Sequence, residues 1–152
     1  MKKKLRVYLD TSVISAQFDR RIPEMRFFTN RFFKAIEKFE PYISEVVLAE
    51  IGRTKDTKLR NKLRNFASSF NILPIDEESR VSADEYIKYG VIPEDYEEDA
   101  LHIAIASVNS IDYFLSWNFE HLVKVKTRKI VGMVNTIFGY SSIEIITPAE
   151  LL

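Results

Sequence analysis

The chain alternates short apolar runs with longer segments in which apolar residues recur every three or four positions. The run at residues 5–9 is interrupted only by Arg6 and leads directly into Asp10. Shorter apolar runs follow at residues 42–43, 72–75, 113–115 and 143–146. Apolar runs with weak alternation are typical of strands in a parallel sheet, because both faces of such a sheet are covered. The pattern predicts five strands, with Asp10 directly after the first.

Helical patterns fill the segments between these runs. Pro23 opens a pattern with an aromatic stripe, and Pro41 ends it. Residues 100–108 are apolar nearly all round, which predicts a buried helix. Another helix is expected from about Phe119, before one at residues 130–137. Strands that alternate with helices predict an α/β fold whose parallel sheet is covered on both faces.

Composition limits the class of protein. The chain has 152 residues, which fits one domain, and 46% of them are hydrophobic, which argues against disorder. The chain has no cysteine, which excludes disulfides and thiolate metal sites and is compatible with the cytoplasm. The apolar run after the N-terminal lysines is too short for a signal peptide or a membrane helix.

Charge is unevenly distributed although the formal net charge is zero. Residues 53–64 form a basic segment, and residues 76–99 are strongly acidic. A basic segment near an acidic pocket suits a polyanionic substrate that is cut with the help of metal ions. Taken by itself, the basic segment is more often a solvated helix face with ordinary charge pairs.

Three acids occupy positions from which they can meet. Asp10 follows the first strand, Glu50 lies in the helix after the second strand, and Asp99 begins the buried helix that leads to the fourth strand. Ligands of open α/β sheets bind at the carboxyl ends of the strands. The competing interpretations are local: Asp10 as a cap or turn residue, and Asp99 as a favourable charge at a helix start.

Converging carboxylates repel one another unless a cation neutralises them. Oxygen ligands without a histidine or cysteine cluster favour Mg2+ or Mn2+, which catalyse phosphodiester hydrolysis. His102 and His121 are far apart in the sequence and lack metal-ligand spacing, so both are interpreted as structural. The chain has no glycine-rich phosphate loop.

Four segments together resemble the successive motifs of PIN-domain proteins. They are YLDTSVI at residues 8–14, SEVVLAEI at 44–51, DALHIAIA at 99–106 and DYFLSWN at 112–118. The resemblance implies a single PIN-like domain over residues 1–152, built as a three-layer α/β/α sandwich with a central parallel sheet of about five strands. It also implies a metal-dependent endoribonuclease. Many small members are toxins of VapC type, which are held by a cognate antitoxin and are commonly dimeric.

The resemblance also assigns roles to individual residues. Asp10, Glu50 and Asp99 match the three metal-binding acids of the family, and Thr11 or Ser12 matches the hydroxyl residue beside the first acid. Asn118 stands where the family often has a fourth acid, so it is expected to orient the attacking water without adding charge. The strand-end residue Ser116 is expected to support the site, or else to serve only as a turn residue.

Several functions remain open at this stage. The leading hypothesis is an Mg2+- or Mn2+-dependent ribonuclease that holds RNA phosphates with basic residues at 53–64 or 124–129. The alternative is a catalytically weak PIN-like module that binds RNA or a protein, which Asn118 favours. A phosphatase of the haloacid-dehalogenase type wants a second Asp where Ser12 stands. A receiver domain wants an adjacent acidic pair at the first strand, and this chain does not have one.

Overall fold

A parallel sheet forms the centre of the molecule. In the computed structural model, which describes residues 3–151, five parallel strands pair in the order β3-β2-β1-β4-β5. The strands are β1 (Leu5–Leu9), β2 (Phe39–Ser44), β3 (Asn71–Leu73), β4 (Tyr113–Leu115) and β5 (Glu144–Ile146). Residues 1–2 and 152, the outermost residues of the expected domain, lie outside the described residues.

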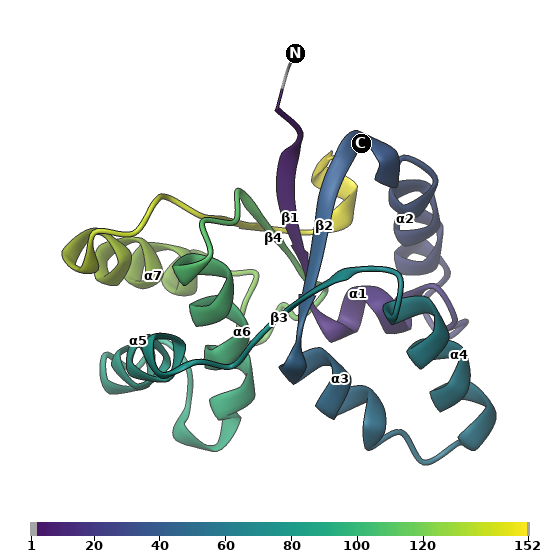
Figure 1. The fold of residues 1–152 in the computed structure, drawn as a ribbon, viewed down its shortest axis with the longest axis horizontal. Coiled ribbons are helices and arrows are strands. Elements are labelled where there is room, and N and C mark those ends of the chain that lie inside the picture. Colours follow the sequence, from purple (N-terminus) through teal and green to yellow (C-terminus); the bar gives the residue numbers. More distant parts are fainter. Residues whose placement is uncertain (1–2, 152) are drawn as a thin grey trace.

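Helices cover both faces of this sheet (Figure 1). One side carries α1 (Thr11–Ala16), α2 (Pro23–Lys34), α3 (Glu45–Gly52) and α4 (Thr57–Ala67). The other side carries α5 (Glu77–Lys88), α6 (Glu97–Val108) and α7 (Val125–Phe138). Three short 3-10 turns, η1 (Ile36–Lys38), η2 (Glu94–Tyr96) and η3 (Pro148–Leu151), complete the described chain. The three-layer α/β/α arrangement expected from the sequence is confirmed.

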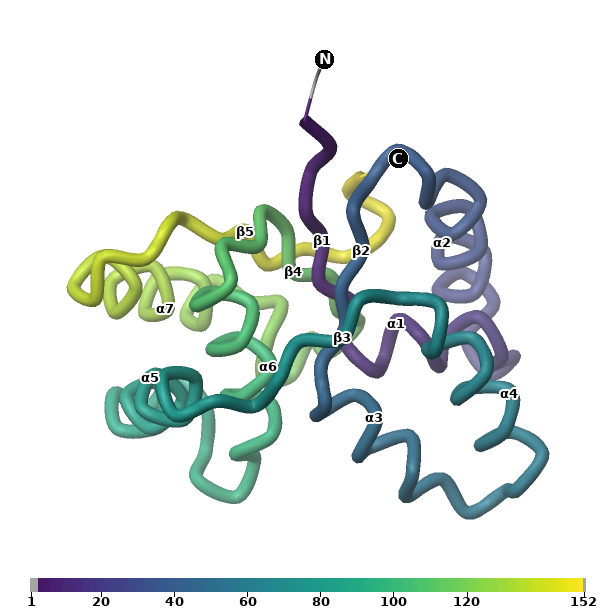
Figure 2. Tube along the Cα trace, viewed as in Figure 1, coloured from purple at the N-terminus to yellow at the C-terminus, as the bar shows by residue number. Residues whose placement is uncertain are grey.

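The strand order reverses direction beside β1, at the centre of the sheet. From β1 the chain builds outward through β2 and β3, and then returns to add β4 and β5 on the other side of β1 (Figure 2). In α/β sheets, ligands bind outside the carboxyl ends of the strands where the order reverses in this way. Here that place lies beyond the ends of β1 and β4, where the chain continues into Asp10 and Ser116.

The core is continuous from the sheet into α6. Val7, Tyr8 and Leu9 are fully buried, and the Tyr8 ring stacks on Phe114 of β4 with 5.1 Å between the ring centroids. Residues 100–107 of α6 are all buried, which confirms the expected buried helix. Leu5 is 44% exposed although the sequence suggested a buried position, because β4 pairs only with residues 7–9 of β1 and leaves the start of the strand uncovered.

Asp10 is the N-cap residue of α1, although its side chain makes no capping hydrogen bond. Two local expectations were wrong. Residues 119–124 form turns, so the helix expected from about Phe119 begins at Val125 instead. Pro41, expected to end a helix, lies within β2, because the helical pattern from Pro23 ends earlier, in η1. None of the described helices combines the length and apolarity needed to cross a membrane.

Candidate active site

Asp10 is held at the carboxyl edge of the sheet by two serine hydroxyls. Its side chain is nearly buried, and its Oδ2 atom accepts hydrogen bonds from Ser12 Oγ at 2.8 Å and from Ser116 Oγ at 2.6 Å. Ser116 directly follows β4, so the second hydroxyl comes from the neighbouring strand. Because the carboxylate points along this edge and does not cap α1, the interpretation of Asp10 as a simple helix cap does not explain its position.

Glu50 reaches the same place from α3. Ser44 ends β2 and caps α3, since its Oγ accepts a hydrogen bond from the backbone N–H of Val46 at 3.1 Å. Glu50 Oε1 then accepts a hydrogen bond from Thr11 Oγ1 at 2.9 Å and contacts Nε2 of His102. Burial opposes ionisation of Glu50, but the hydrogen bond and the charge of His102 outweigh it and lower the Glu50 pKa.

His102 lies at the centre of the cluster, although only a structural role was expected for it. It follows Asp99 by three residues on α6 and is fully buried. Its Nε2 contacts Glu50 and lies 3.5 Å from Oδ1 of Asp10. Burial alone would lower the pKa of the imidazole, but the surrounding acids Glu50, Asp10 and Asp99 raise it. The i, i+3 spacing from Asp99 was the available sequence signal, because residues three apart share a helix face.

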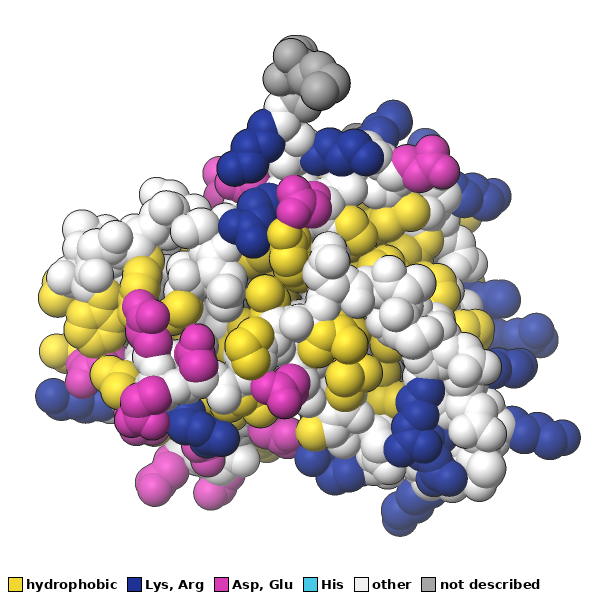
Figure 3. Space-filling view, viewed as in Figure 1, with side chains coloured by type: hydrophobic (Ala, Val, Ile, Leu, Met, Phe, Trp, Pro, Cys, Tyr) yellow, Lys and Arg dark blue, Asp and Glu magenta, His cyan; other side chains and the backbone are white. Residues whose placement is uncertain are grey.

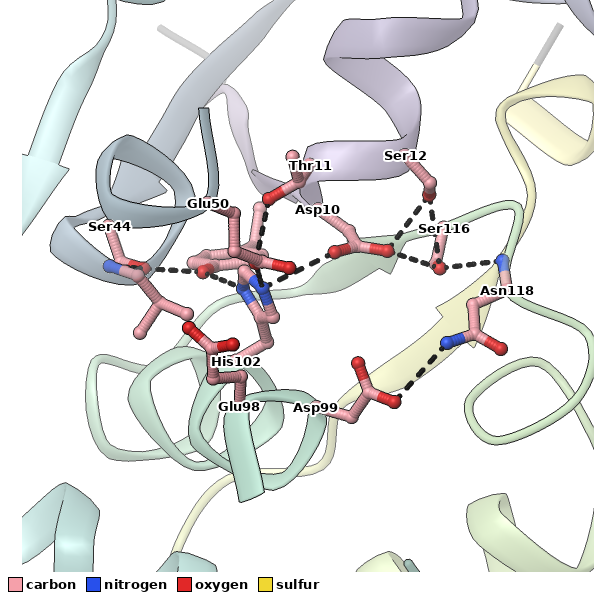
Figure 4. Close-up of polar contacts among 12 residues, drawn as sticks. Asp10, Thr11, Ser12, Ser44, Glu50, Glu98, Asp99, His102, Ser116 and Asn118 are labelled. Carbon is pink, nitrogen blue, oxygen red and sulfur yellow. Dashed lines mark hydrogen bonds and ion pairs between the residues drawn. The ribbon is translucent and has the colours of Figure 1, made fainter. Parts of the chain in front are cut away.

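Asp99 faces the cluster from the start of α6 (Figure 4). Its Oδ2 atom accepts hydrogen bonds from His121 Nδ1 at 2.9 Å and from Asn118 Nδ2 at 3.4 Å. Burial and the negative charge of Asp10 raise the pKa of Asp99, against the opposing effect of the hydrogen bond from His121. Hydrogen bonds from neighbouring donors therefore support the ionised form of Asp99 in this place.

Asn118 contacts both Asp99 and the loop that follows β4. Its Oδ1 accepts the backbone N–H of His121 at 2.9 Å, and its Nδ2 points to Asp99. The expectation that Asn118 orients the attacking water stays a prediction, and the structure adds that its oxygen also holds the loop. His121, whose ring centroid lies 4.1 Å from that of Tyr96, is a second site residue that the sequence did not reveal. No local sequence pattern identifies His121 as a site residue, because it is the turns after β4 that bring it back to α6.

The cluster offers donor atoms at metal-binding distances. One ligand atom each from Asp10, Glu50 and His102 can be chosen so that all lie within 4.8 Å of one another. Carboxylate oxygens and an imidazole nitrogen at this spacing fit a divalent cation. A hollow of about 350 Å³ opens beside them and is lined by Glu50, Asp99 and the acidic residues of 95–98. Glu98 pairs with Arg53 at 2.6 Å and so turns its carboxylate toward the surface.

Comparison with known proteins agrees with this geometry. Residues 7–118 match the family model of the PIN domain. VapC20 of Mycobacterium tuberculosis, described as a sarcin-ricin loop cleaving toxin, superposes with a TM-score of 0.62 at 13% identity and covers 90% of this chain and 97% of that one.

Two further structures are similar over nearly their whole length. FitAcB of Neisseria gonorrhoeae has a TM-score of 0.59 at 18% identity, with 93% of this chain and 97% of that chain covered. DNA-bound VapBC of Salmonella typhimurium has a TM-score of 0.59 at 16% identity, with 95% and 98% covered. No curated protein matches the sequence.

Proposed function

Because the chain belongs to the PIN domain family, we propose that it is a metal-dependent endoribonuclease that hydrolyses phosphodiester bonds of RNA. The observation that supports this most strongly is that Asp10 and Glu50 offer ligand atoms within 4.8 Å of each other at the carboxyl edge of β1 and β4, while Asp99 lies close enough for the charge of Asp10 to raise its pKa. Buried acids are costly unless they are paired or bind a cation. Their position at the reversal of strand order is where an α/β sheet presents a ligand site.

The side chains around the acids position them for this chemistry. Asp10 and Asp99 would hold the principal ion, and Glu50 would hold it directly or through a water. When bound, Mg2+ or Mn2+ would supply the acidification of a water and the neutralisation of phosphate charge that phosphodiester hydrolysis needs. Ser12 and Ser116 fix the Asp10 carboxylate by donating to its Oδ2.

Support for the other two acids comes from further elements. Thr11 donates to Glu50 from the start of α1, and His121 and Asn118 hold Asp99 from the loop after β4. Each acid therefore has at least one donor that fixes its direction. Such outer contacts are commonly needed to keep metal ligands in a productive orientation.

A basic surface of the molecule is available to hold RNA phosphates. Lys and Arg side chains gather on the side of α2 and α4, while Asp and Glu gather over α5 (Figure 3). Within the basic segment 53–64, Arg53 pairs with Glu98, and Arg60 donates to the carbonyl of Thr54 at 3.0 Å. Exposed cations remain at Lys55, Lys58, Lys62 and Arg64. These four are the proposed phosphate contacts, because exposed cations supply most sequence-independent affinity for nucleic acid.

The similar structures suggest a biological setting. They include toxin–antitoxin assemblies, among them one from Klebsiella pneumoniae with a TM-score of 0.58 at 18% identity. We therefore infer that the chain acts in the cytoplasm as the toxin of a type II pair, as a homodimer controlled by a cognate antitoxin. Induced expression of the wild type should arrest growth of a host, whereas the Asp10→Asn variant should not.

Cleavage of RNA in vitro tests the enzyme directly. The wild type should cut a mixed RNA substrate in Mn2+ or Mg2+ and should stop in EDTA. Asp10→Asn should lose activity, and the matched change Asp84→Asn, at an exposed acid of α5, should retain it. Activity that survives EDTA, or equal loss in both variants, would contradict the proposal.

The second candidate is a catalytically weak PIN-like module that binds RNA or a protein. It is favoured by Asn118, which adds no charge where the family often has an acid. Saturable RNA binding without cleavage in either metal would support this alternative over the enzyme.

A further inference from the structure

We propose that His102 is a nitrogen ligand of the metal ion in this site, and that the site therefore selects a transition-metal ion such as Mn2+ over Mg2+. The inference rests on the proposed metal-dependent function and specifies which ion the site prefers. The usual expectation for acids at this edge is an oxygen-only site, so His102 changes the chemistry of this particular chain.

The position of the imidazole supports a direct bond to the ion. Nε2 contacts Oε1 of Glu50 and lies 3.5 Å from Oδ1 of Asp10. Ligand bonds to small divalent ions are about 2.0–2.2 Å, so neighbouring ligand atoms of one ion lie roughly 3 Å apart. Figure 4 shows the ring of His102 next to the Glu50 side chain, with the carboxylate of Asp10 to one side. An ion held by those two acids would therefore lie within reach of Nε2.

The other ring nitrogen is held as metal-binding histidines commonly are. Nδ1 lies 2.6 Å from Oη of Tyr8, and Tyr8 Oη lies 2.7 Å from Oγ of Ser44. All three side chains are fully buried. When a metal ion takes the place of the Nε2 proton, the remaining proton lies on Nδ1, so the ring donates to Tyr8, Tyr8 donates to Ser44, and the lone pair of Nε2 faces the ion. An outer partner of this kind fixes the tautomer and the orientation of a ligand histidine.

Ion selection follows from the nature of the donor. Imidazole nitrogen suits transition metals, whereas Mg2+ prefers oxygen ligands and keeps several of its waters. Replacing one oxygen ligand by His102 therefore favours Mn2+ over Mg2+. If His102 serves instead as a charged partner of Glu50, it contributes no nitrogen bond and no such preference.

Pulsed electron paramagnetic resonance of bound Mn2+ separates these roles without measuring activity. The wild type with one equivalent of Mn2+ should show coupling to a directly bonded 14N nucleus. His102→Gln should lose this coupling, and Asp84→Asn, at an exposed acid of α5 away from the site, should keep it as the control. By calorimetric titration, His102→Gln should weaken Mn2+ binding by at least about ten- to a hundredfold and should affect Mg2+ binding much less.

A second variant covers the case in which His102→Gln does not fold. Tyr8→Phe keeps His102 but removes the hydroxyl beside Nδ1. It should retain the 14N coupling while weakening Mn2+ binding by about ten- to a hundredfold. Circular dichroism checks the fold of each variant.

The results that would overturn the inference are distinct from those that would overturn the proposed function. Mn2+ that binds the wild type without 14N coupling, or coupling that survives in His102→Gln, removes His102 as a ligand and leaves a metal-dependent nuclease possible. No binding of Mn2+ or Mg2+ at millimolar concentration removes both proposals.

Discussion

Asn118→Asp is the most informative single change at the site. Asn118 donates from Nδ2 to Oδ2 of Asp99 across 3.4 Å, while its Oδ1 is engaged by the backbone N–H of His121. In the variant one carboxylate oxygen can keep the loop contact, so the other one faces Asp99. The change replaces a hydrogen-bond donor by a like charge at almost constant size.

The size of the effect follows from the distance. Two unit charges about 4 Å apart repel by roughly 4 kcal/mol at an effective dielectric constant of about 20. Uptake of a proton by one acid relieves part of this, so we expect a net loss of about 2 kcal/mol of unfolding free energy at pH 7. For a chain of this length that is a fall of roughly 4–8 °C in melting temperature.

The pH dependence has a definite sign. Repulsion raises the pKa of the acid pair in the folded state above the unfolded value of about 3.9. The penalty is therefore present above this pH and disappears as the pH falls below it, where both acids are protonated in both states. In Mn2+, Asn118→Asp should instead melt at a higher temperature than the wild type. The added charge tightens binding of the cation, and this binding stabilises the folded state.

Thermal melting followed by circular dichroism measures all of these quantities, first in EDTA at pH 7 and pH 4, then at pH 7 with Mn2+. Asn118→Ala is the control, since it removes the amide without adding charge. It should slow single-turnover RNA cleavage by about ten- to a hundredfold, as expected for one lost positioning contact of about 1–3 kcal/mol. If Asn118→Asp melts at or above the wild-type temperature in EDTA at pH 7, residue 118 does not face Asp99 and the reasoning fails.

Three other substitutions test neighbouring contacts. Ser116→Ala removes the 2.6 Å hydrogen bond to Oδ2 of Asp10 and should weaken Mn2+ binding about ten- to a hundredfold by calorimetry. Burial and the charge of Asp10 raise the pKa of Asp99, so Asp99→Asn should raise the metal-free melting temperature at pH 7, by a gain that shrinks as the pH falls through about 4. The same variant should abolish the rise in melting temperature that Mn2+ causes. A variant that is destabilised instead would make Asp99 a purely structural acid. Burial raises the pKa of Tyr86 to about 12, and its Oη donates to Asn135 Oδ1 at 2.5 Å. Tyr86→Phe should cost about 1–3 kcal/mol in denaturant unfolding without changing Mn2+ affinity. Between pH 10 and 12 the wild type alone should also lose stability from this group, because the unfolded tyrosine releases its proton at about pH 10.

The local sequence determined the elements and the edge at which the acids lie. Apolar runs with weak alternation identified the strands, and Ser44, a residue type that favours N-cap positions, stands where α3 begins and caps it. Asp10 follows a buried strand directly, and parallel strands bring their carboxyl ends to one edge. These features could be predicted because each depends on a few consecutive residues and on a rule that holds for any parallel sheet.

Only the tertiary structure decided what surrounds each acid. His102 contacts Tyr8, 94 residues earlier, and Glu50, 52 residues earlier, while His121 reaches Asp99 across 22 residues. No periodicity in the sequence encodes such pairs, because they depend on how α6 and the loop after β4 pack against the sheet. For the same reason the sequence did not predict that the oxygen of Asn118 holds the turn at His121. Strand order and helix packing bring distant donors and acids together, and so they determine the charge and the ligand atoms of the site.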